Sequence, residues 1–536
     1  MPADVRSSVR TAEQQRPDTR RRAQPAHAGP AERRWVTVAG VGALTLLCLG
    51  LALYKLGYAY WVDESMSIGI SSHPITEIPT VLRQDGTPPL FYMLLHIWTG
   101  FFGTGEQATG ALSVIFAVLC VPVAFWGGSS VFGRRAGWFC AALTAVNGLI
   151  VRYASETRMY SLMALLSLLA TFAFLHAFVL RRRGYLPVFS IAICAMLYTH
   201  TWAVFFVIAA LVGTGVCLLT TSDRRGVIVD ALIAFGAAGV GFLPWVPNLL
   251  YQARNTGAPW AAIPSIKEPF LRPIVLWGAW PAAFVLLPMG ALGVAHLLRR
   301  RRSPATVAFL TAAAMLAAFV LSSWVNARIN PGWSPRYFIA IIGPSILVAA
   351  VALARAGRLG TVALIIVAVV GFKPWVFFDN PVGNDGLSNL KTVSRTIGPH
   401  LQPRDLVIGL EPGQVTTLYH YLPPGLRYAT SMGPVRDPGV IDWRNVVDRL
   451  EHADVKRDVG PLIDALPKGA HVAVAIPNFS RESHLTRYFE LVNQRGAELV
   501  KFVTRDPRLA LLLVVPPART YAVGASAHVH VFVKTR

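Results

Sequence analysis

Long apolar runs separated by short polar stretches dominate the chain up to about residue 378. A helix needs about 20 apolar residues to cross the hydrocarbon core of a membrane. The runs predict eleven such helices, at about 35–57, 108–131, 137–152, 159–180, 185–200, 202–220, 226–248, 272–297, 304–325, 337–354 and 360–377. The pattern therefore predicts a polytopic α-helical membrane protein with about 11 transmembrane helices.

One further apolar segment, at 88–98, is too short for a comfortable crossing. We interpret it as an interfacial or re-entrant helix, and the arginine clusters between the apolar runs support this interpretation. If the segment does not cross, all of these clusters fall on one side, and the positive-inside rule makes that side cytoplasmic. The clusters are Arg20 to Arg22, Arg134 and Arg135, Arg181 to Arg183, Arg224 and Arg225, and Arg299 to Arg302.

After residue 379 the composition changes to that of a soluble α/β domain. Apolar, β-branched runs at 405–409, 471–476, 508–515 and 528–533 predict strands, and helical stretches follow the first two. We divide the chain into a disordered basic cytoplasmic tail (1–34), a transmembrane domain (35–378) and an extracytoplasmic α/β domain (379–536). The glycine pattern of a dinucleotide-binding fold is missing, since residues 409–413 read Gly-Leu-Glu-Pro-Gly.

Composition supports the same class of protein. The 536 residues are 54% hydrophobic and only 15% charged, which is too apolar for a soluble protein of this length. The net charge of +22 comes largely from arginines placed beside the predicted spans. It therefore reflects the membrane topology and contact with membrane lipids, and it gives no support for a nucleic-acid partner. The five cysteines lie inside predicted spans and have neither metal-ligand nor redox spacing.

Polar residues that look out of place in a membrane protein converge on the outer side of this topology. An arginine can hold a phosphate bidentately, and a carboxylate can take a proton from an attacking hydroxyl. The pattern suits the handling of a phosphate-bearing lipid, although each residue also has a plainer explanation: Glu156 and Arg158 as a loop ion pair, His200 as an interfacial histidine, Arg336 as a membrane anchor. The candidate site comprises Asp63, Glu64, Asp85, Glu156, Arg158, Tyr160, His200, Arg336 and Tyr337.

Several of these residues lie in motifs that resemble those of the GT-C glycosyltransferases. The nearest group is the protein-mannosyltransferase and aminoarabinose-transferase branch, including RgtA-type bacterial members, and the resemblance covers roughly residues 35–345. The motifs are Asp63-Glu64 after the first span, Pro88-Pro89-Leu90-Phe91-Tyr92, the stretch Tyr-Ala-Ser-Glu-Thr-Arg-Met-Tyr at 153–160, Tyr198-Thr199-His200 and Pro335-Arg336-Tyr337.

The resemblance implies a GT-C-like transmembrane catalytic domain that moves a sugar from a polyprenyl-phosphate donor to an acceptor hydroxyl with inversion. By position, Asp63 is the general base, and Glu156 places the acceptor or, together with Asp63, an optional divalent cation (Mg or Mn). Arg336 holds the leaving phosphate, and Arg158 and His200 assist. Glu64 joins the catalytic carboxylates, while Asp85, Tyr160 and Tyr337 contribute to substrate binding.

One position departs from the pattern of that family. Many relatives carry an arginine near the start of the second span, and here the matching stretch, residues 108–113, places Gly110 at that point. If that arginine helps to hold the donor phosphate in relatives, Arg336 or another basic residue must do more in this chain.

The expected function is that of a glycosyltransferase, adding a hexose or pentose to a glycan, lipid or protein on the outer face of the plasma membrane. Two other classes stay open: a lipid-linked glycan transporter or flippase, and a non-catalytic envelope assembly factor. A transporter places its discriminating charges near the bilayer midplane, often within inverted repeats. The sequence shows no repeat, and its charges fall at the outer edge.

Overall fold

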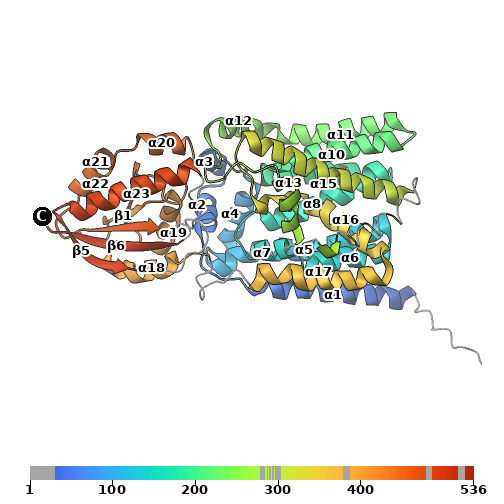
Figure 1. Ribbon diagram of the computed structural model, residues 1–536, viewed down its shortest axis with the longest axis horizontal. Helices are drawn as coiled ribbons and strands as arrows, with labels where there is room; N and C mark the ends of the chain where they lie inside the picture. Colours follow the sequence, from blue (N-terminus) through green and yellow to red (C-terminus); the bar gives the residue numbers. More distant parts are fainter. Residues whose placement is uncertain are drawn as a thin grey trace, which may run out of the picture.

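The computed structural model describes residues 30–277, 284–286, 288, 291, 295, 303–377, 387–478, 486–516 and 526–536. A bundle of long helices forms one end of the elongated molecule, and an α/β domain forms the other (Figure 1). Short helices lie between them. The main helices of the bundle and of this junction are α1 (Pro30–Leu53), α2 (Val62–Ser71), α3 (Ile78–Asp85), α4 (Leu90–Phe102), α5 (Glu106–Phe132), α6 (Arg134–Ala145), α7 (Gly148–Tyr153), α8 (Tyr160–Phe174), α9 (Leu186–Thr199), α10 (Ala203–Thr220), α11 (Arg224–Phe242), α12 (Val246–Asn255), α15 (Pro304–Ile329), α16 (Ile342–Arg355) and α17 (Gly357–Phe377).

In the part of the chain that the structure describes, seven helical segments are long and apolar enough to cross a membrane. Shorter apolar helices cover three further segments, Leu90–Phe102, Arg183–Thr199 and Gly357–Val370. The polytopic helical fold is therefore confirmed. Most of the predicted span at 272–297 lies outside the described residues.

Two details refine the predicted spans. The segment expected to cross at 137–152 consists of two helices, α6 and α7, because the side chain of Asn147 accepts hydrogen bonds from the backbone N–H groups of Leu149 and Ile150 and so caps a new helix. The short apolar segment beside Pro88 and Pro89 forms α4, whose 13 residues are too few to span a bilayer.

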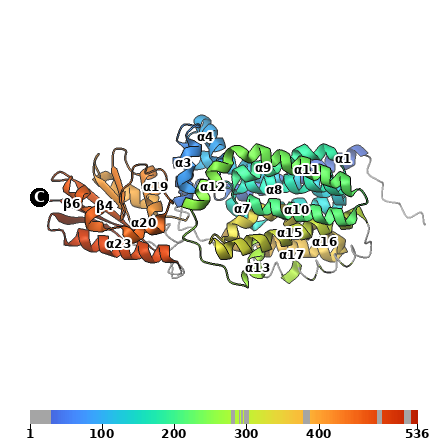
Figure 2. The same ribbon diagram turned by 90° about the horizontal axis from the view of Figure 1, so that it is seen from above.

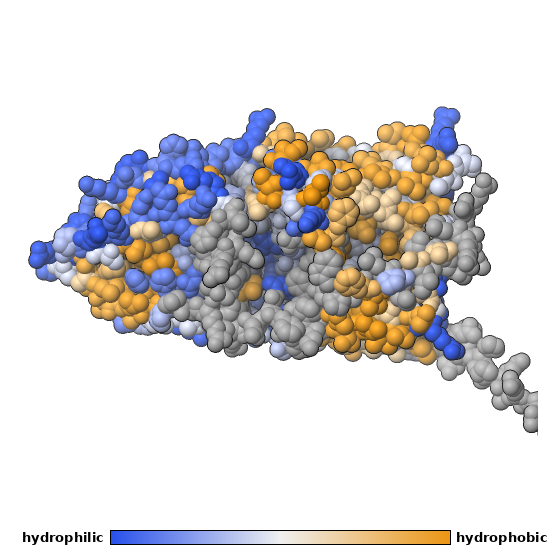
Figure 3. Space-filling view, in the orientation of Figure 1, coloured by the Kyte–Doolittle hydropathy of each residue, from blue (hydrophilic) through white to orange (hydrophobic). Residues whose placement is uncertain are grey.

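Burial distinguishes a central helix from lipid-facing ones. In the most apolar 18-residue stretch of the segment Tyr160–Val179, 89% is buried inside the protein. The corresponding share for the segment Arg224–Asn255 is 28%. Thus α8 lies inside the bundle of helices (Figure 2). The helix α11 exposes side chains such as Leu232 to the surroundings. Hydrophobic residues cover much of the bundle in Figure 3, and hydrophilic residues cover much of the α/β domain, as expected for a membrane-embedded and a water-exposed part.

The α/β domain contains one six-stranded sheet in the order β3-β2-β1-β4-β6-β5. β1 is parallel to β2 and β4, while β6 is antiparallel to both β4 and β5. The strands are β1 (Leu406–Gly409), β2 (Arg427–Thr430), β3 (Gly433–Pro434), β4 (His471–Pro477), β5 (Leu509–Val515) and β6 (Ala527–Lys534). Apolar side chains of α18 (Leu390–Ile397) and α19 (Pro412–Tyr421) pack on one face, and those of α21 (Val455–Asp458), α22 (Gly460–Asp464) and α23 (Arg487–Arg505) pack on the other.

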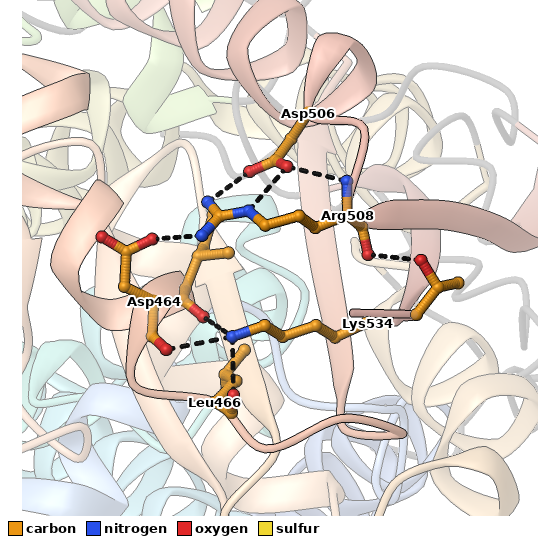
Figure 4. Close-up of polar contacts among 7 residues, drawn as sticks. Asp464, Leu466, Asp506, Arg508 and Lys534 are labelled. Atoms are coloured by element: carbon orange, nitrogen blue, oxygen red, sulfur yellow. Dashed lines mark hydrogen bonds and ion pairs between the residues drawn. The ribbon is translucent and has the colours of Figure 1, made fainter.

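At the end of this domain, polar contacts tie three elements together (Figure 4). The buried ammonium of Lys534, at the end of β6, donates hydrogen bonds to the backbone carbonyls of Ile463, Asp464 and Leu466. Arg508, just before β5, pairs with the carboxylates of Asp464 and Asp506. The Lys534 bonds satisfy carbonyls left open at and just after the C-terminal end of α22.

The two parts of the molecule meet through main-chain contacts. The backbone N–H of Trp443 donates to the carbonyl of Gln84 (2.9 Å), and that of Asn445 donates to the carbonyl of Asn255 (2.8 Å). On another side of the interface, the hydroxyl of Tyr421 donates to Oε1 of Glu106 (2.9 Å). The α/β domain therefore sits directly over the ends of α3, α5 and α12.

Candidate functional site

A cavity of about 830 Å³ lies where the bundle meets the α/β domain. Its lining includes Asp63, Asp85, Arg158, His200 and Arg336, five residues that the sequence singled out. They come from α2, α3, the loop before α8, the end of α9 and the 3₁₀ helix η5 (Pro335–Ile341). The fold thus gathers residues from across the first 340 positions at one place.

The centre of the site is an ion pair between Asp63 and Arg336. Nη1 of Arg336 lies 2.7 Å from Oδ2 of Asp63, and the two side chains are only 17% and 18% exposed. The guanidinium also lies over the rings of Trp61, Trp260 and Tyr337, at 5.7, 5.2 and 5.7 Å from the ring centres. Within the described residues, its buried Nε–H has no hydrogen-bond acceptor. Arg336 is held in place by the ion pair and the rings, and its buried Nε–H is still available to donate a hydrogen bond.

Arg158 supports the helix that carries Asp63. Its Nη1 donates to the backbone carbonyl of Asp63 (3.2 Å), to Oγ of Ser67 (3.2 Å) and to the hydroxyl of Tyr92 (3.4 Å). The Arg158 side chain is buried, so these bonds form where water screens them little. Among the residues that the structure describes, Arg158 forms no salt bridge with Glu156, so the plainer explanation of a loop ion pair does not account for it; Arg158 instead joins α2 to α4.

Glu64 has a different position from its neighbour. Its Oε1 accepts the backbone N–H of Thr157 (2.9 Å), and its Oε2 accepts the backbone N–H of Trp61 (3.4 Å). Burial and the nearby Glu156 carboxylate raise the pKa of Glu64 well above its ordinary value. Glu64 is outside the cavity lining, so its geometry favours a positioning role over the catalytic role expected from the sequence.

Glu156 lies in the loop between α7 and α8. One of its oxygens, Oε2, is buried and has no hydrogen-bond partner in the described part of the chain. Burial raises the pKa of Glu156 to about 7, and the charge of Asp63 acts in the same direction while Arg152 and Arg336 oppose it. Glu156 therefore changes charge near neutral pH, close to the Asp63–Arg336 pair.

Asp85 ends α3 and lies on another wall of the cavity. Its Oδ2 accepts hydrogen bonds from the hydroxyls of Thr87 and Tyr92 (the latter at 3.5 Å). Burial is the main cause that raises the pKa of Asp85. Behind it, Nε2 of Gln252 donates to the carbonyls of Leu82 (2.8 Å) and Thr87 (3.1 Å) and fixes the turn that carries Asp85.

His200 is a neutral donor on the third wall. Its Nδ1 accepts the backbone N–H of Trp202 (3.0 Å), so the ring proton is on Nε2. Its ring lies 4.7 Å from that of Tyr337 and 6.1 Å from that of Tyr160, which is buried and lies behind the cavity wall.

The α/β domain supplies lining that the sequence analysis missed. Trp443, Asn445, Asp448 and Glu451 face the same cavity as Arg336. Trp443 and Asn445 lie just before α20 (Val446–His452), and Asp448 and Glu451 lie within it. No sequence motif marks these residues. The one available signal was Trp443, which stands in an otherwise polar stretch.

A divalent cation at Asp63 and Glu156 does not fit the residues present. Among the described residues, no group of three or more His, Cys, Asp or Glu side chains is placed to hold a metal ion. Arg336 already pairs with Oδ2 of Asp63, and its positive charge lies where a second cation would have to bind. We therefore derive no step through a metal.

The packing around position 110 explains why a glycine stands there. A Cβ atom at this position would lie 2.7 Å from Cδ1 of Leu56 and 2.7 Å from the backbone oxygen of Ser155. The helix α5 packs directly against the loop that carries Glu156 and Arg158. An arginine side chain at this position would have to displace that loop.

Comparison with solved structures shows the fold that this cavity belongs to. The chain is similar to ArnT from Cupriavidus metallidurans bound to undecaprenyl phosphate, with a TM-score of 0.57 and 14% identity over 93% of this chain and 98% of that one. It is also similar to the Archaeoglobus fulgidus oligosaccharyltransferase in complex with Zn and sulfate, with a TM-score of 0.53 and 12% identity over 91% and 73% of the two chains.

A third similar structure is the arabinofuranosyltransferase AftD from Mycobacteria, with a TM-score of 0.52 and 13% identity over 94% of this chain and 40% of that one. No protein-family profile and no curated relative matches the sequence. The expected fold is therefore confirmed: the chain has the GT-C membrane fold followed by an α/β domain.

Proposed function

We propose that this chain, with its GT-C fold and the Asp63–Arg336 pair in its cavity, is a membrane glycosyltransferase that uses a polyprenyl-phosphate-linked sugar. The sugar would pass to an acceptor hydroxyl on the extracytoplasmic side of the plasma membrane, with the N-terminus in the cytoplasm. Support comes from ArnT, whose structure contains undecaprenyl phosphate, and from the motifs of the first 345 residues. The acceptor would be a glycan, lipid or protein of the cell envelope.

The observation that carries the proposal is the ion pair on the cavity wall. Asp63 has a carboxylate oxygen in place to take a proton, and Arg336 has a buried Nε–H that lacks an acceptor among the described residues. A phosphate oxygen of the donor is suited to that N–H, since charge-assisted bonds between guanidinium and phosphate are strong. One residue thus reaches both the base and the leaving group.

In the proposed reaction, the acceptor oxygen forms a bond to the anomeric carbon while the bond from that carbon to the phosphate oxygen breaks. The acceptor proton goes to Asp63, and the electron pair of the broken bond goes to polyprenyl phosphate. Arg336 stabilises the charge that develops on the phosphate, and neutral His200 can donate a hydrogen bond from Nε2. A single displacement of this kind inverts the anomeric carbon.

The experiment uses the full chain in proteoliposomes with a panel of radiolabelled polyprenyl-phosphate-linked hexoses and pentoses and a cell-envelope extract as acceptor. Release of polyprenyl phosphate and labelling of the extract are measured for wild type, Asp63→Asn and Glu77→Gln. Glu77 is an exposed carboxylate of the same segment outside the cavity, which makes it a matched control.

We expect Asp63→Asn to abolish transfer and Glu77→Gln to leave it unchanged. Lipid translocation, followed with a fluorescent polyprenyl-phosphate glycolipid, should not depend on Asp63. Transfer by Asp63→Asn at the wild-type rate would end the proposal, and loss of translocation alone would support a flippase.

A further inference from the structure

One polar atom in the cavity wall has no role in the reaction described above. Gln252, on α12, lines the cavity although its side chain is only 3% exposed. Its Oε1 is buried and receives no hydrogen bond from any residue that the structure describes. A buried acceptor without a donor costs about 1–3 kcal/mol, so such atoms in a cavity point to a ligand.

The orientation of this amide is fixed by its other end. Nε2 donates to two backbone carbonyls, those of Leu82 and Thr87, at 2.8 and 3.1 Å. Turning the amide over would place Oε1 against both carbonyl oxygens, which would repel it. Oε1 is therefore held as an unpaired acceptor within a residue that lines the cavity.

Asp85 adds a second acceptor to the same wall. The hydroxyls of Thr87 and Tyr92 both donate to Oδ2 of Asp85, and Thr87 also receives the amide of Gln252 at its carbonyl. The turn is compact, because a Cβ atom on Gly86, whose φ is +91°, would lie 2.6 Å from Oγ1 of Thr256. The wall is thus built as one unit by α3 and α12.

The wall formed by Gln252 and Asp85 presents hydrogen-bond acceptors, whereas Arg336 presents a cationic donor. Two oxygen acceptors repel a phosphate and attract groups that donate hydrogen bonds. The group need not carry a positive charge, since Arg158, Arg254 and Arg336 already balance most of the negative charge in the cavity lining, which comes from Asp63, Asp85, Asp448 and Glu451. A neutral hydroxyl group satisfies both conditions.

We propose that Gln252 and Asp85 form a subsite that binds a sugar hydroxyl of the substrate and so selects hydroxylated sugars over deoxy sugars. This inference rests on the proposed function and names the group recognised. The hydroxyl belongs either to the transferred sugar or to the acceptor glycan, and the two sources give different results in the test.

The test uses the full chain in proteoliposomes with the panel donor that wild type transfers and a series of its deoxy analogues, each lacking one hydroxyl. Wild type, Gln252→Met and Asn248→Leu are compared. Asn248 lies on the same helix and also links α12 to α3, through Nε of Arg83 (2.7 Å), but it is outside the cavity lining. It controls for loosening of the α3–α12 contact.

If the hydroxyl is on the transferred sugar, Gln252→Met loses about tenfold in kcat/KM, the size of one neutral hydrogen bond. One deoxy donor shows the same loss with wild type and no further loss with the variant. Donor hydrolysis in the absence of acceptor falls in parallel.

If the hydroxyl is on the acceptor, hydrolysis is unchanged and only transfer falls, by a similar factor, with a raised KM for the acceptor. Asn248→Leu transfers as wild type does in both cases. The subsite is refuted if Gln252→Met weakens every donor equally in hydrolysis and transfer, as a folding defect would.

The wild-type deoxy series alone also decides, should Gln252→Met fail to fold. If every deoxy donor and every deoxygenated acceptor is used within threefold of its parent, the inference is overturned. If wild type releases polyprenyl phosphate from no donor of the panel, the proposed function itself fails first.

Discussion

The contact between Gly110 and the loop of Glu156 gives the sharpest prediction. In Gly110→Ala, the new Cβ would lie 2.7 Å from the backbone oxygen of Ser155. A relaxed carbon–oxygen contact of this kind measures about 3.3–3.6 Å, so the loop must retreat by roughly 0.7 Å. Thr157, which binds Glu64, and Arg158, which binds the α2 backbone, follow within three residues.

A displacement of about 1 Å in a catalytic group can cost about 100-fold in rate. We therefore expect Gly110→Ala to lose between about tenfold and 100-fold in release of polyprenyl phosphate. The free energy of unfolding should fall by at most about 2 kcal/mol, because the higher helix propensity of alanine, about 1 kcal/mol, offsets part of the overpacking strain of about 1–3 kcal/mol. Gly110→Arg should lose more activity still.

The control is Gly50→Ala in α1, where a Cβ atom would meet nothing within 4 Å. Both variants are assayed in proteoliposomes for donor turnover and by thermal unfolding in detergent. If Gly110→Ala keeps more than half of the wild-type turnover, or if Gly110→Arg exceeds wild type, the loop does not position the site as argued.

Three further predictions concern charged residues. Arg336→Lys loses the Nε–H and the stacking on aromatic rings, so donor turnover should fall at least tenfold with the fold intact; wild-type turnover would refute a role in phosphate binding. Because burial raises the pKa of Glu156 to about 7, its negative charge appears above that pH and competes with the donor phosphate for arginine; the KM for the donor should rise above pH 7, and Glu156→Gln should remove this rise. Burial raises the pKa of Glu411 from 4.5 to about 7, so the folded state binds more protons than the unfolded state, and the free energy of unfolding should fall by roughly 3 kcal/mol between pH 4.5 and 7. Thermal unfolding of wild type and Glu411→Gln as a function of pH tests this. Equal pH dependence of stability in the two proteins would contradict it.

The transmembrane pattern and the main site residues could be predicted from the sequence because both follow from one-dimensional rules. The lengths of the apolar runs and the placement of the arginines predict which loops lie on the same side of the membrane. This prediction places Asp63, Glu156 and Arg336 at the same end of the bundle. The rules do not say which loops touch. The 2.7 Å pairing of Asp63 with Arg336 depends on packing among α2, η5 and the aromatic residues around them.

Other features left too little signal. The strand β2 has only four residues and no apolar run, so it was missed, whereas the longer β4 and β6 were found. Gln252 belongs to no recognisable motif in α12, and its role depends on backbone carbonyls that lie about 170 positions earlier in the chain. An amide whose partners are backbone atoms has no sequence motif, because every residue type supplies the same carbonyl.

The same reasoning explains why the coupling of the α/β domain to Asp63 is visible only in three dimensions. The ten-residue helix α2 begins beside Asp63, and near its other end Gly69 lies against the backbone of Gly439 with no room for a side chain. Just past α2, Nε2 of His73 lies 3.0 Å from Oδ2 of Asp437. A helix of this length is about 15 Å long and bends little, so a tilt forced on its last turn by the α/β domain also moves the carboxylate in its first turn. The position of the proposed base is therefore set jointly by the membrane bundle, through Arg158 and Arg336, and by the domain that covers the cavity.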